Sequence, residues 1–383
     1  MQRPETTEAS SEGRWQIGKL LRPRSLEAKL VVTELETSEP ADWRRHWTWA
    51  KWLVAATCLT LLFWHHGPGL SKITRELTWQ SVDWLSVLTA IVLCGGAILL
   101  TFLRWYCLVA ALRLKFTIRD AMRLGFIGYL FNFVGPGSVG GDLVKAVLLA
   151  KEQPDRRTTA VATVLLDRIL GLLALFIIGA CAAWWQWDDI QQRAELKAIV
   201  GLLAVGSAAG LVGLGLMMIP AVTQSRVWTW IARLPVIGHL IAELVEGVRL
   251  YQTQRHVLVL ALGISLLGHL GTISSFYFSA RAISGTKFLP TYAQHLFFIP
   301  AGELAGIVPL SPGGLGLLEG AIDSLYELNG AAAGTGFLTV LAYRAVTIVI
   351  SLIGAGYYFS SRREIDQALH VEPNGPNDPV ASK

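Results

Sequence analysis

Long apolar runs, separated by short polar stretches, recur along most of the chain. The uninterrupted runs are about 20 residues long, which is enough for a helix to cross about 30 Å of hydrocarbon. They predict membrane-spanning helices at roughly 47–64, 84–103, 160–185, 196–219, 256–281 and 334–359. This pattern indicates an all-α integral membrane protein with about six full spans.

Two further apolar regions, 120–150 and 290–328, are interrupted in the middle by glycine and proline. The breaks read FVGPGSVGG (133–141) and VPLSPGGLG (308–316). Each flanking arm has only about 12–18 residues, which is short for a full span. Irregular backbone at membrane depth survives only when it is buried in protein or lines a wet cavity. We therefore expect two broken or re-entrant helical hairpins, although a count of eight full crossings stays open.

Composition supports the membrane assignment. Of 383 residues, 52% are hydrophobic and 16% charged, and the mean hydropathy is +0.46. Soluble domains carry about a quarter charged residues. The four cysteines lie in or beside apolar runs without metal-like spacing, so they are interpreted as buried apolar side chains. The net charge of +5 does not indicate nucleic acid, because the basic residues follow membrane topology.

The distribution of basic residues predicts the orientation. Eight lysines and arginines precede Trp47, whereas few lie in the loops of the opposite side. We expect a plasma-membrane (cell inner membrane) protein with both termini cytoplasmic. The predicted organisation is a polar cytoplasmic tail at 1–46, a membrane domain at 47–360 and a disordered cytoplasmic tail at 361–383. Within the membrane domain, 226–252 has the spacing of an amphipathic helix that lies on the interface.

The two breaks belong to an internal repeat. Pro136 and Pro312 lie 176 residues apart, and an arginine follows each of them by 32 positions, Arg168 and Arg344. An acidic residue also follows each break. Because the spans 84–103 and 256–281 run in opposite directions, the halves at about 84–219 and 256–359 are predicted inverted repeats. In transporters with this plan, broken helices mark the binding site.

The breaks favour an anionic ligand. A helix that starts after a glycine-rich break presents unpaired N–H groups and the positive end of its dipole. Arginine can bind a phosphate through two hydrogen bonds. Ionisable groups at membrane depth are expensive and are usually functional. The candidate substrate-binding residues are Asn132, Gly137, Gly140, Asp142, Lys145, Asp167, Arg168, Glu303, Ser311, Gly313, Gly314, Glu319 and Arg344.

Structural interpretations of individual residues stay open beside this one. Asp142 and Lys145 are three apart and can pair with each other on one helix. Asp167 and Arg168 point about 100° apart on a helix, so each needs another partner. Arg104, beside Trp105, is interpreted as an interfacial residue. His269 is interpreted as a hydrogen-bonding partner between helices.

At these residues the sequence resembles the flippase-like transmembrane region of bacterial lysylphosphatidylglycerol synthases. The matching elements are Arg104-Trp105, Asn132, Gly135-Pro136-Gly137, Gly140-Gly141-Asp142, Asp167-Arg168, PLSPGGLG at 309–316, Glu319 and Tyr343-Arg344. The resemblance covers roughly 48–360. The chain departs from it at Lys145, where the family often has arginine, and at Asp167, where it often has glutamate. No large polar domain remains for aminoacyl transfer, so lysylation of a lipid is not expected.

The resemblance implies movement of a lipid between leaflets, without a catalytic site and without a cofactor. The expected substrate is an anionic or aminoacylated phospholipid or a polyprenyl-phosphate lipid, and a lipid-modifying enzyme is a possible partner. The alternative is a membrane glycosyltransferase, or an accessory subunit, that acts on polyprenyl-phosphate-linked lipids. Against it, the only acidic doublet is Asp188-Asp189, on the predicted non-cytoplasmic side. An intramembrane serine protease built on Ser138 and His269 lacks a recognisable nucleophile motif.

Overall fold

The computed structural model describes residues 80–134, 140–223, 249–284, 289–307 and 314–360, together with Thr57 and Thr60. Within these ranges the regular structure is helical and contains no strand. The elements are α4 (Trp84–Ala111), α5 (Ile118–Val134), α6 (Gly140–Glu152), η2 (Pro154–Arg156), α7 (Arg157–Trp185), α8 (Trp187–Ile190), α9 (Ala194–Met217), α10 (Pro220–Thr223), η3 (Gln252–Gln254), α13 (Arg255–Ser284), α14 (Tyr292–Ile307), α15 (Leu317–Leu328) and α16 (Thr335–Ser360).

Long apolar helices dominate the described part of the chain. Five stretches are long and apolar enough to cross a membrane: Trp84–Ala111, Pro154–Trp185, Ala194–Met217, Arg249–Ile283 and Thr335–Ser360. They coincide with five of the predicted spans, which confirms the all-α membrane architecture. The predicted span at 47–64, the two polar tails and most of the predicted interfacial helix at 226–252 lie outside the described residues. The number of full crossings stays a prediction.

The two interrupted regions form pairs of short helices. α5 and α6 have 17 and 13 residues, and α14 and α15 have 16 and 12. The helices of each pair pack against one another. In the first pair the backbones touch, because a Cβ added at Gly141 would lie 1.9 Å from the carbonyl oxygen of Gly128. This arrangement is that of the predicted broken hairpins, whose central residues at 135–139 and 308–313 lie outside the described ranges.

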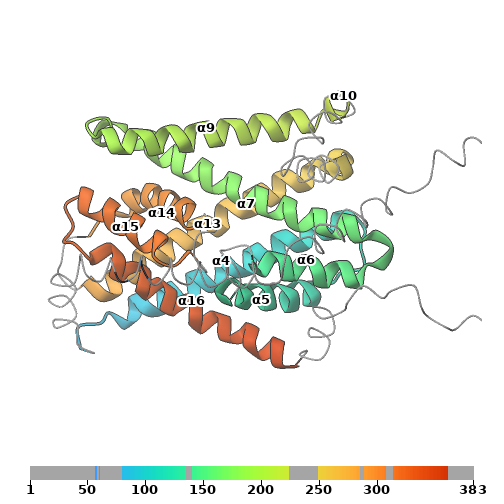
Figure 1. Cartoon of the computed structure of the whole chain (residues 1–383), viewed down its shortest axis with the longest axis horizontal. Coiled ribbons are helices and arrows are strands. Elements are labelled where there is room, and N and C mark those ends of the chain that lie inside the picture. Colours follow the sequence, from blue (N-terminus) through green and yellow to red (C-terminus); the bar gives the residue numbers. More distant parts are fainter. Residues whose placement is uncertain are drawn as a thin grey trace, which may run out of the picture. The chain divides into compact units, whose positions relative to one another are not determined.

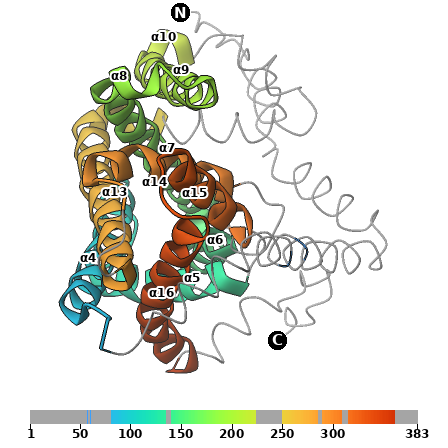
Figure 2. The same cartoon turned by 90° about the vertical axis from the view of Figure 1, so that its left-hand side faces the viewer.

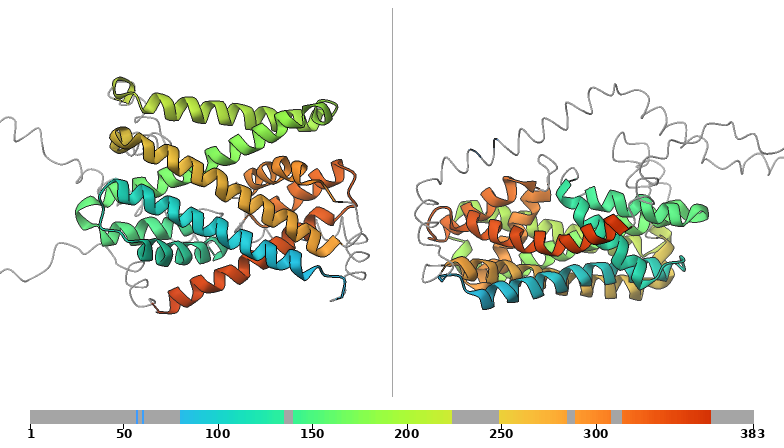
Figure 3. Two further views of the ribbon diagram at one scale, coloured as in Figure 1. Left: turned by 180° about the vertical axis from the view of Figure 1, so that it is seen from behind. Right: turned by 90° about the horizontal axis from the view of Figure 1, so that it is seen from below.

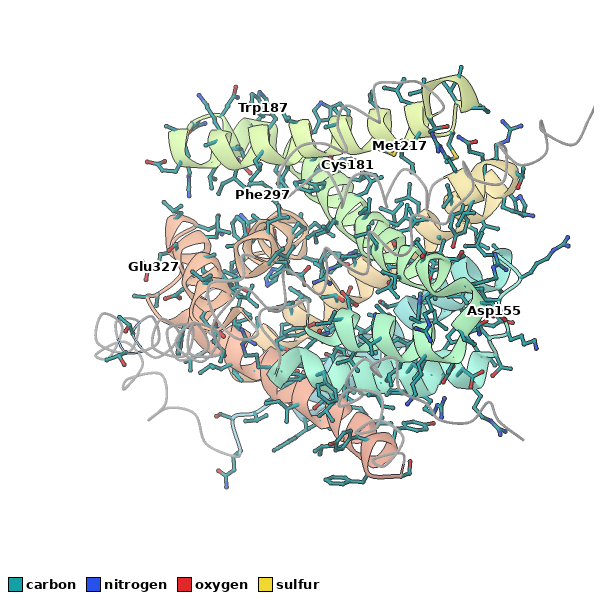
Figure 4. The ribbon with its side chains drawn as sticks, turned by 45° about the vertical axis from the view of Figure 1, so that its right-hand side comes forward. Asp155, Cys181, Trp187, Met217, Phe297 and Glu327 are labelled. Carbon is teal, nitrogen blue, oxygen red and sulfur yellow. The ribbon has the colours of Figure 1, made fainter. Side chains whose placement is uncertain are left out.

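The two halves make the same packing contacts when each helix is replaced by its equivalent in the other half. α4 and α13 pack against each other. α7 of the first half packs on α14 of the second, and correspondingly α16 packs on α5. The α5–α6 pair and the α14–α15 pair lie at opposite ends of the long helices (Figure 1; Figure 3). Asp155, which precedes α7, and Glu327, on α15, mark these two ends in Figure 4. The fold is therefore a pair of inverted repeats, α4–α7 and α13–α16.

α9 lies outside this paired arrangement. Its principal neighbour is α7, and it runs along the outer side of the helices in Figure 2. Apolar side chains such as Leu202, Val205 and Val212 are mostly exposed along it, as expected for a helix in contact with lipid. No described helix after α16 corresponds to α9. Within the described residues, the inter-repeat packing that positions the site therefore comes from the eight helices of the two repeats.

Candidate substrate-binding site

One cavity is bordered by helix ends from both repeats. Its volume is about 320 Å³. The end of α5 contributes Asn132 and the start of α6 contributes Asp142, while the end of α14 contributes Gly306 and the start of α15 contributes Leu318. The parts of both hairpins that flank the breaks thus meet at the same space. This is the place where the inverted-repeat plan puts a binding site.

The cavity wall contains a buried ion pair between α4 and α7. Arg104 donates from Nε to Oδ1 of Asp167 at 2.7 Å and from Nη2 to Oδ2 at 2.9 Å. Its Nη1 donates to Oγ of Ser265 on α13 at 2.5 Å. Arg104 is only 6% exposed. The interfacial interpretation of Arg104 is therefore wrong. The arginine is drawn inward because Asp167 supplies a carboxylate of matching bidentate geometry.

A second charged group joins α6 to α7. Lys145 Nζ lies 2.6 Å from Oδ1 of Asp142, so the expected pairing within α6 is present. The same carboxylate faces α7, where Arg168 Nε lies 3.4 Å from Oδ2. Lys145 also lies over the Trp105 ring, 5.4 Å from its centre. Asp142 therefore neutralises two cations at once, and the side chain of Arg168 remains 34% exposed beside the cavity.

The side-chain amide of Asn132 joins the two helices of the first hairpin beside the break. Its Oδ1 accepts a hydrogen bond from the backbone N–H of Gly141 at 3.0 Å. The Gly141 N–H is one of the first in α6, so it has no carbonyl partner within its own helix. Asn132 thus fastens the end of α5 to the start of α6. Gly140, in the same turn, is buried.

The second repeat contains the equivalent acid–arginine pair. Glu319, in the first turn of α15, accepts hydrogen bonds from Arg344 Nε on α16 and, at 2.8 Å, from the backbone N–H of Gly316. Glu319 is fully buried. Asp142 with Arg168 and Glu319 with Arg344 thus occupy equivalent positions, each joining the helix after a break to the last helix of its repeat. Gly314 has a positive φ of 67°, and a Cβ there would lie 2.7 Å from the Gly306 carbonyl oxygen.

Glu303 and His269 complete the polar wall. Glu303 lies on α14 and His269 on α13, and both border the cavity. Oε2 of Glu303 and Nδ1 of His269 are 3.8 Å apart. The other ring nitrogen, Nε2, lies 3.0 Å from the backbone carbonyl oxygen of Gly171 on α7. His269 therefore does make the expected contact between helices, and it also faces a carboxylate.

The predicted site residues fall into three groups. Those that border the cavity are Asn132, Asp142, Lys145, Asp167, Arg168 and Glu303. Those in the adjoining packed structure are Gly140, Gly314, Glu319 and Arg344. Gly137, Ser311 and Gly313 lie outside the described residues. The candidate set missed Arg104 and His269. The position of Arg104, 32 residues before Pro136, was the one sequence signal that could have included it.

The described part of the lining favours recognition of a charged ligand. Three cations, Arg104, Lys145 and Arg168, face the carboxylates of Asp142, Asp167 and Glu303. Arg104 is buried in its ion pair, whereas the side chain of Arg168 borders the cavity and is 34% exposed, so a ligand oxygen can reach it. Within the described ranges, no group of three or more histidine, cysteine, aspartate or glutamate side chains is arranged to hold a metal ion.

The comparisons with known proteins point to one family. Residues 48–354 match the family described as the lysylphosphatidylglycerol synthase TM region. Two relatives are UPF0104 membrane proteins of Methanothermobacter thermautotrophicus. One is 24% identical over 316 residues, which cover 76% of this chain and 88% of the relative. The other is 25% identical over 332 residues, which cover 81% of this chain and 94% of the relative.

Proposed function

Because the chain belongs to the lysylphosphatidylglycerol synthase TM-region family, we propose that this multi-pass membrane protein is a flippase-like lipid transporter. Its substrate is an anionic or aminoacylated phospholipid, or a polyprenyl-phosphate lipid, which it moves between leaflets. It acts without a catalytic site of its own. It resides in the cell inner (plasma) membrane with both termini in the cytoplasm, as the asymmetry of the basic residues favours.

The observation that carries this proposal is the charged cavity between the two hairpins. Six charged side chains, Arg104, Asp142, Lys145, Asp167, Arg168 and Glu303, border a space that both repeats enclose. Burying so many charges in a membrane domain is costly, and such groups mark substrate pathways. A lipid headgroup is the part of a lipid that needs polar groups while it passes the bilayer midplane. The remaining lipid chains can stay in hydrocarbon.

Five of these six charged groups have a role in this proposal. Arg168 and Lys145 contact the headgroup phosphate, since Asp142 holds both of them beside the cavity. Asp167 and Arg104 hold α4, α7 and α13 together, so that Arg168 keeps its position on α7. Glu319 and Arg344 fix the second hairpin against α16. The two equivalent pairs favour a mechanism in which the hairpins move as units around a central site.

The alternative, a glycosyltransferase or an accessory subunit for polyprenyl-phosphate-linked lipids, has weaker support. The acidic doublet Asp188–Asp189 lies on the short helix α8 and does not border the cavity. A partner enzyme that makes or modifies the lipid is compatible with either role. Transfer of a sugar from a lipid donor by the purified protein would reverse this preference.

The proposal is tested by lipid transfer in proteoliposomes. The assay follows quenching of headgroup-labelled phosphatidylglycerol, aminoacylated phosphatidylglycerol or polyprenyl phosphate from the outside. We expect transfer of at least one lipid by the wild type, and a fall of about tenfold or more in Arg168→Ala, Glu319→Ala and Arg344→Ala. The matched control is Arg157→Ala, an exposed arginine on the same helix as Arg168, which should transfer normally. Wild-type rates in all three folded site variants would refute the proposed site.

A further inference from the structure

The contacts of His269 determine which of its ring nitrogens carries hydrogen. Nε2 lies 3.0 Å from the carbonyl oxygen of Gly171. A carbonyl oxygen only accepts hydrogen bonds, so Nε2 must be the nitrogen that donates. In the neutral ring Nδ1 then has no hydrogen and presents a lone pair. That lone pair faces Oε2 of Glu303 at 3.8 Å.

An ionised Glu303 and a neutral His269 would therefore present two acceptors to each other. One added proton resolves this conflict. Placed on the carboxylate, it lets Glu303 donate toward Nδ1; placed on Nδ1, it makes an imidazolium that pairs with the carboxylate. A small approach of the two side chains, which lie 3.8 Å apart, completes the hydrogen bond. The packing of α13 against α14 holds the two groups together, so they form a site for a single proton.

That proton also sets the charge of the cavity. Arg104, Lys145 and Arg168 contribute three positive charges, and Asp142 and Asp167 contribute two negative ones. With Glu303 ionised and His269 neutral the wall has no net charge. With one proton on the pair the wall has one net positive charge. A phosphodiester headgroup such as that of phosphatidylglycerol carries one negative charge, so the protonated cavity matches it.

We propose that Glu303 and His269 form a one-proton binding site, and that a lipid with a monoanionic phosphodiester headgroup binds in the cavity together with that proton. This inference rests on the proposed lipid-transport function and adds its energy source. Lipid and proton cross together without net movement of charge. A proton gradient across the membrane therefore sets the direction of lipid transfer.

The other charged groups around Glu303 already have partners in the structure. From α7 and α4, Asp167 and Arg104 are joined by two hydrogen bonds. From α15, Glu319 is joined to Arg344. The groups that complete the surroundings are Arg168, Asp142 and Lys145, which form one cluster, and the side chains of Tyr129, Tyr343 and Cys94. Glu303 with His269 is thus the pair whose geometry calls for an added proton.

Thermodynamic linkage between lipid and proton binding determines how the lipid affinity depends on pH and how steep that dependence can be. If the lipid binds with a proton, it binds more tightly at low pH, and its affinity falls as the pH rises through the range where the pair loses the proton. For one proton the dissociation constant can rise by at most about tenfold per pH unit. By reciprocity, lipid binding makes the pair hold its proton more tightly.

The test is calorimetric titration of the purified full-length protein in detergent with dioctanoyl-phosphatidylglycerol. Repeating it between about pH 5.5 and about pH 8, in buffers of different ionisation enthalpy, gives both the dissociation constant and the number of protons taken up. We expect uptake approaching one proton and an affinity that falls with pH. In Glu303→Gln the uptake should disappear, and the dissociation constant should change less than about twofold per pH unit. Glu195→Gln, an exposed acid on α9, is the matched control and should behave as the wild type.

A second measurement covers the case in which Glu303→Gln does not fold. Infrared difference spectra on addition of the lipid should show the carbonyl band of a newly protonated carboxylic acid, or the ring bands of an imidazolium. His269→Gln should remove or shift that signal. Lipid binding without proton uptake, or uptake that persists in both variants, would overturn the inference and leave the transport function intact. Absence of lipid binding at every pH would overturn the headgroup site, and the inference with it.

Discussion

Replacing Asp167 by leucine removes the carboxylate that holds the buried guanidinium of Arg104. Arg104 is 6% exposed and makes two hydrogen bonds to Asp167 and one to Ser265. In Asp167→Leu the arginine keeps only the Ser265 hydroxyl, so a positive charge stays buried with one partner. The same reasoning applies in reverse to Arg104→Met, which strands the carboxylate.

The loss in free energy of unfolding that each single variant should show follows from two different estimates. Breaking a buried ion pair by removing one partner costs about 3–5 kcal/mol in soluble proteins. Polar contacts between membrane helices are weaker, about 0.6 kcal/mol on average, because the unfolded state in the membrane also finds partners. The Arg104–Asp167 contact is bidentate and charged, and each such hydrogen bond contributes about 1.5–3 kcal/mol. We therefore expect each single variant to lower the free energy of unfolding by about 3 kcal/mol.

The double variant Arg104→Met/Asp167→Leu gives the sharper result. The double variant leaves no buried charge without a partner. Its loss in free energy of unfolding should therefore be smaller than the sum of the two single losses, by about 2 kcal/mol or more. The assay is reversible unfolding by a denaturing detergent in mixed micelles, followed by tryptophan fluorescence. Asp189→Asn, an exposed acid on α8, is the control and should change stability by less than about 0.5 kcal/mol. Additive losses within about 0.5 kcal/mol would refute the coupling inferred from the contacts.

Further predictions concern the first hairpin and the start of α4. Gly141→Ala should lower the free energy of unfolding by at least about 2 kcal/mol in the same assay, because its Cβ would lie 1.9 Å from the carbonyl oxygen of Gly128. Gly201→Ala, with nothing within 4 Å of the added Cβ, should be neutral or stabilising by up to about 1 kcal/mol, and equal effects of the two would contradict the packing. The Ser86 hydroxyl and backbone N–H lower the pKa of Asp83, so Ser86→Ala should raise that pKa when followed by carbon NMR. The depressed pKa means that Asp83 stabilises the fold above its ordinary pKa of about 3.9, and that this contribution is lost as the pH falls through the folded value.

Much of the fold could be predicted because membrane helices are specified by length and apolar character. The five described spans coincide with apolar runs, and the broken hairpins coincide with runs that glycine and proline interrupt. Arg168 and Arg344 follow their prolines by the same number of residues, and this equal spacing predicted the inverted repeat, because equivalent positions in two copies keep their spacing. The helix α4 nonetheless extends to Ala111, beyond the predicted end at 103. It continues because residues 104–111 contain no glycine or proline that would end it.

The partners of the charged residues were harder to predict from the sequence. The sequence shows that Asp167 and Arg168 point apart and that each needs a partner, but it does not identify the partner. Arg104 lies 63 residues before Asp167, and the contact depends on how α4 packs against α7. The pairing of His269 with Glu303 depends in the same way on the packing of α13 against α14. Side chains that meet through tertiary packing leave no local spacing to recognise.

The central claim is that the cavity between the hairpins receives the lipid headgroup. It is tested most directly by photolabelling in nanodiscs with a phosphatidylglycerol analogue that carries a diazirine in its headgroup, followed by mapping of the labelled peptides. The account predicts labels on cavity residues of both repeats, for example Leu172 on α7 and Ile307 on α14. An excess of unlabelled phosphatidylglycerol should remove them. Labels found only at the ends of the helices and on exposed residues such as Leu202 of α9 would contradict it.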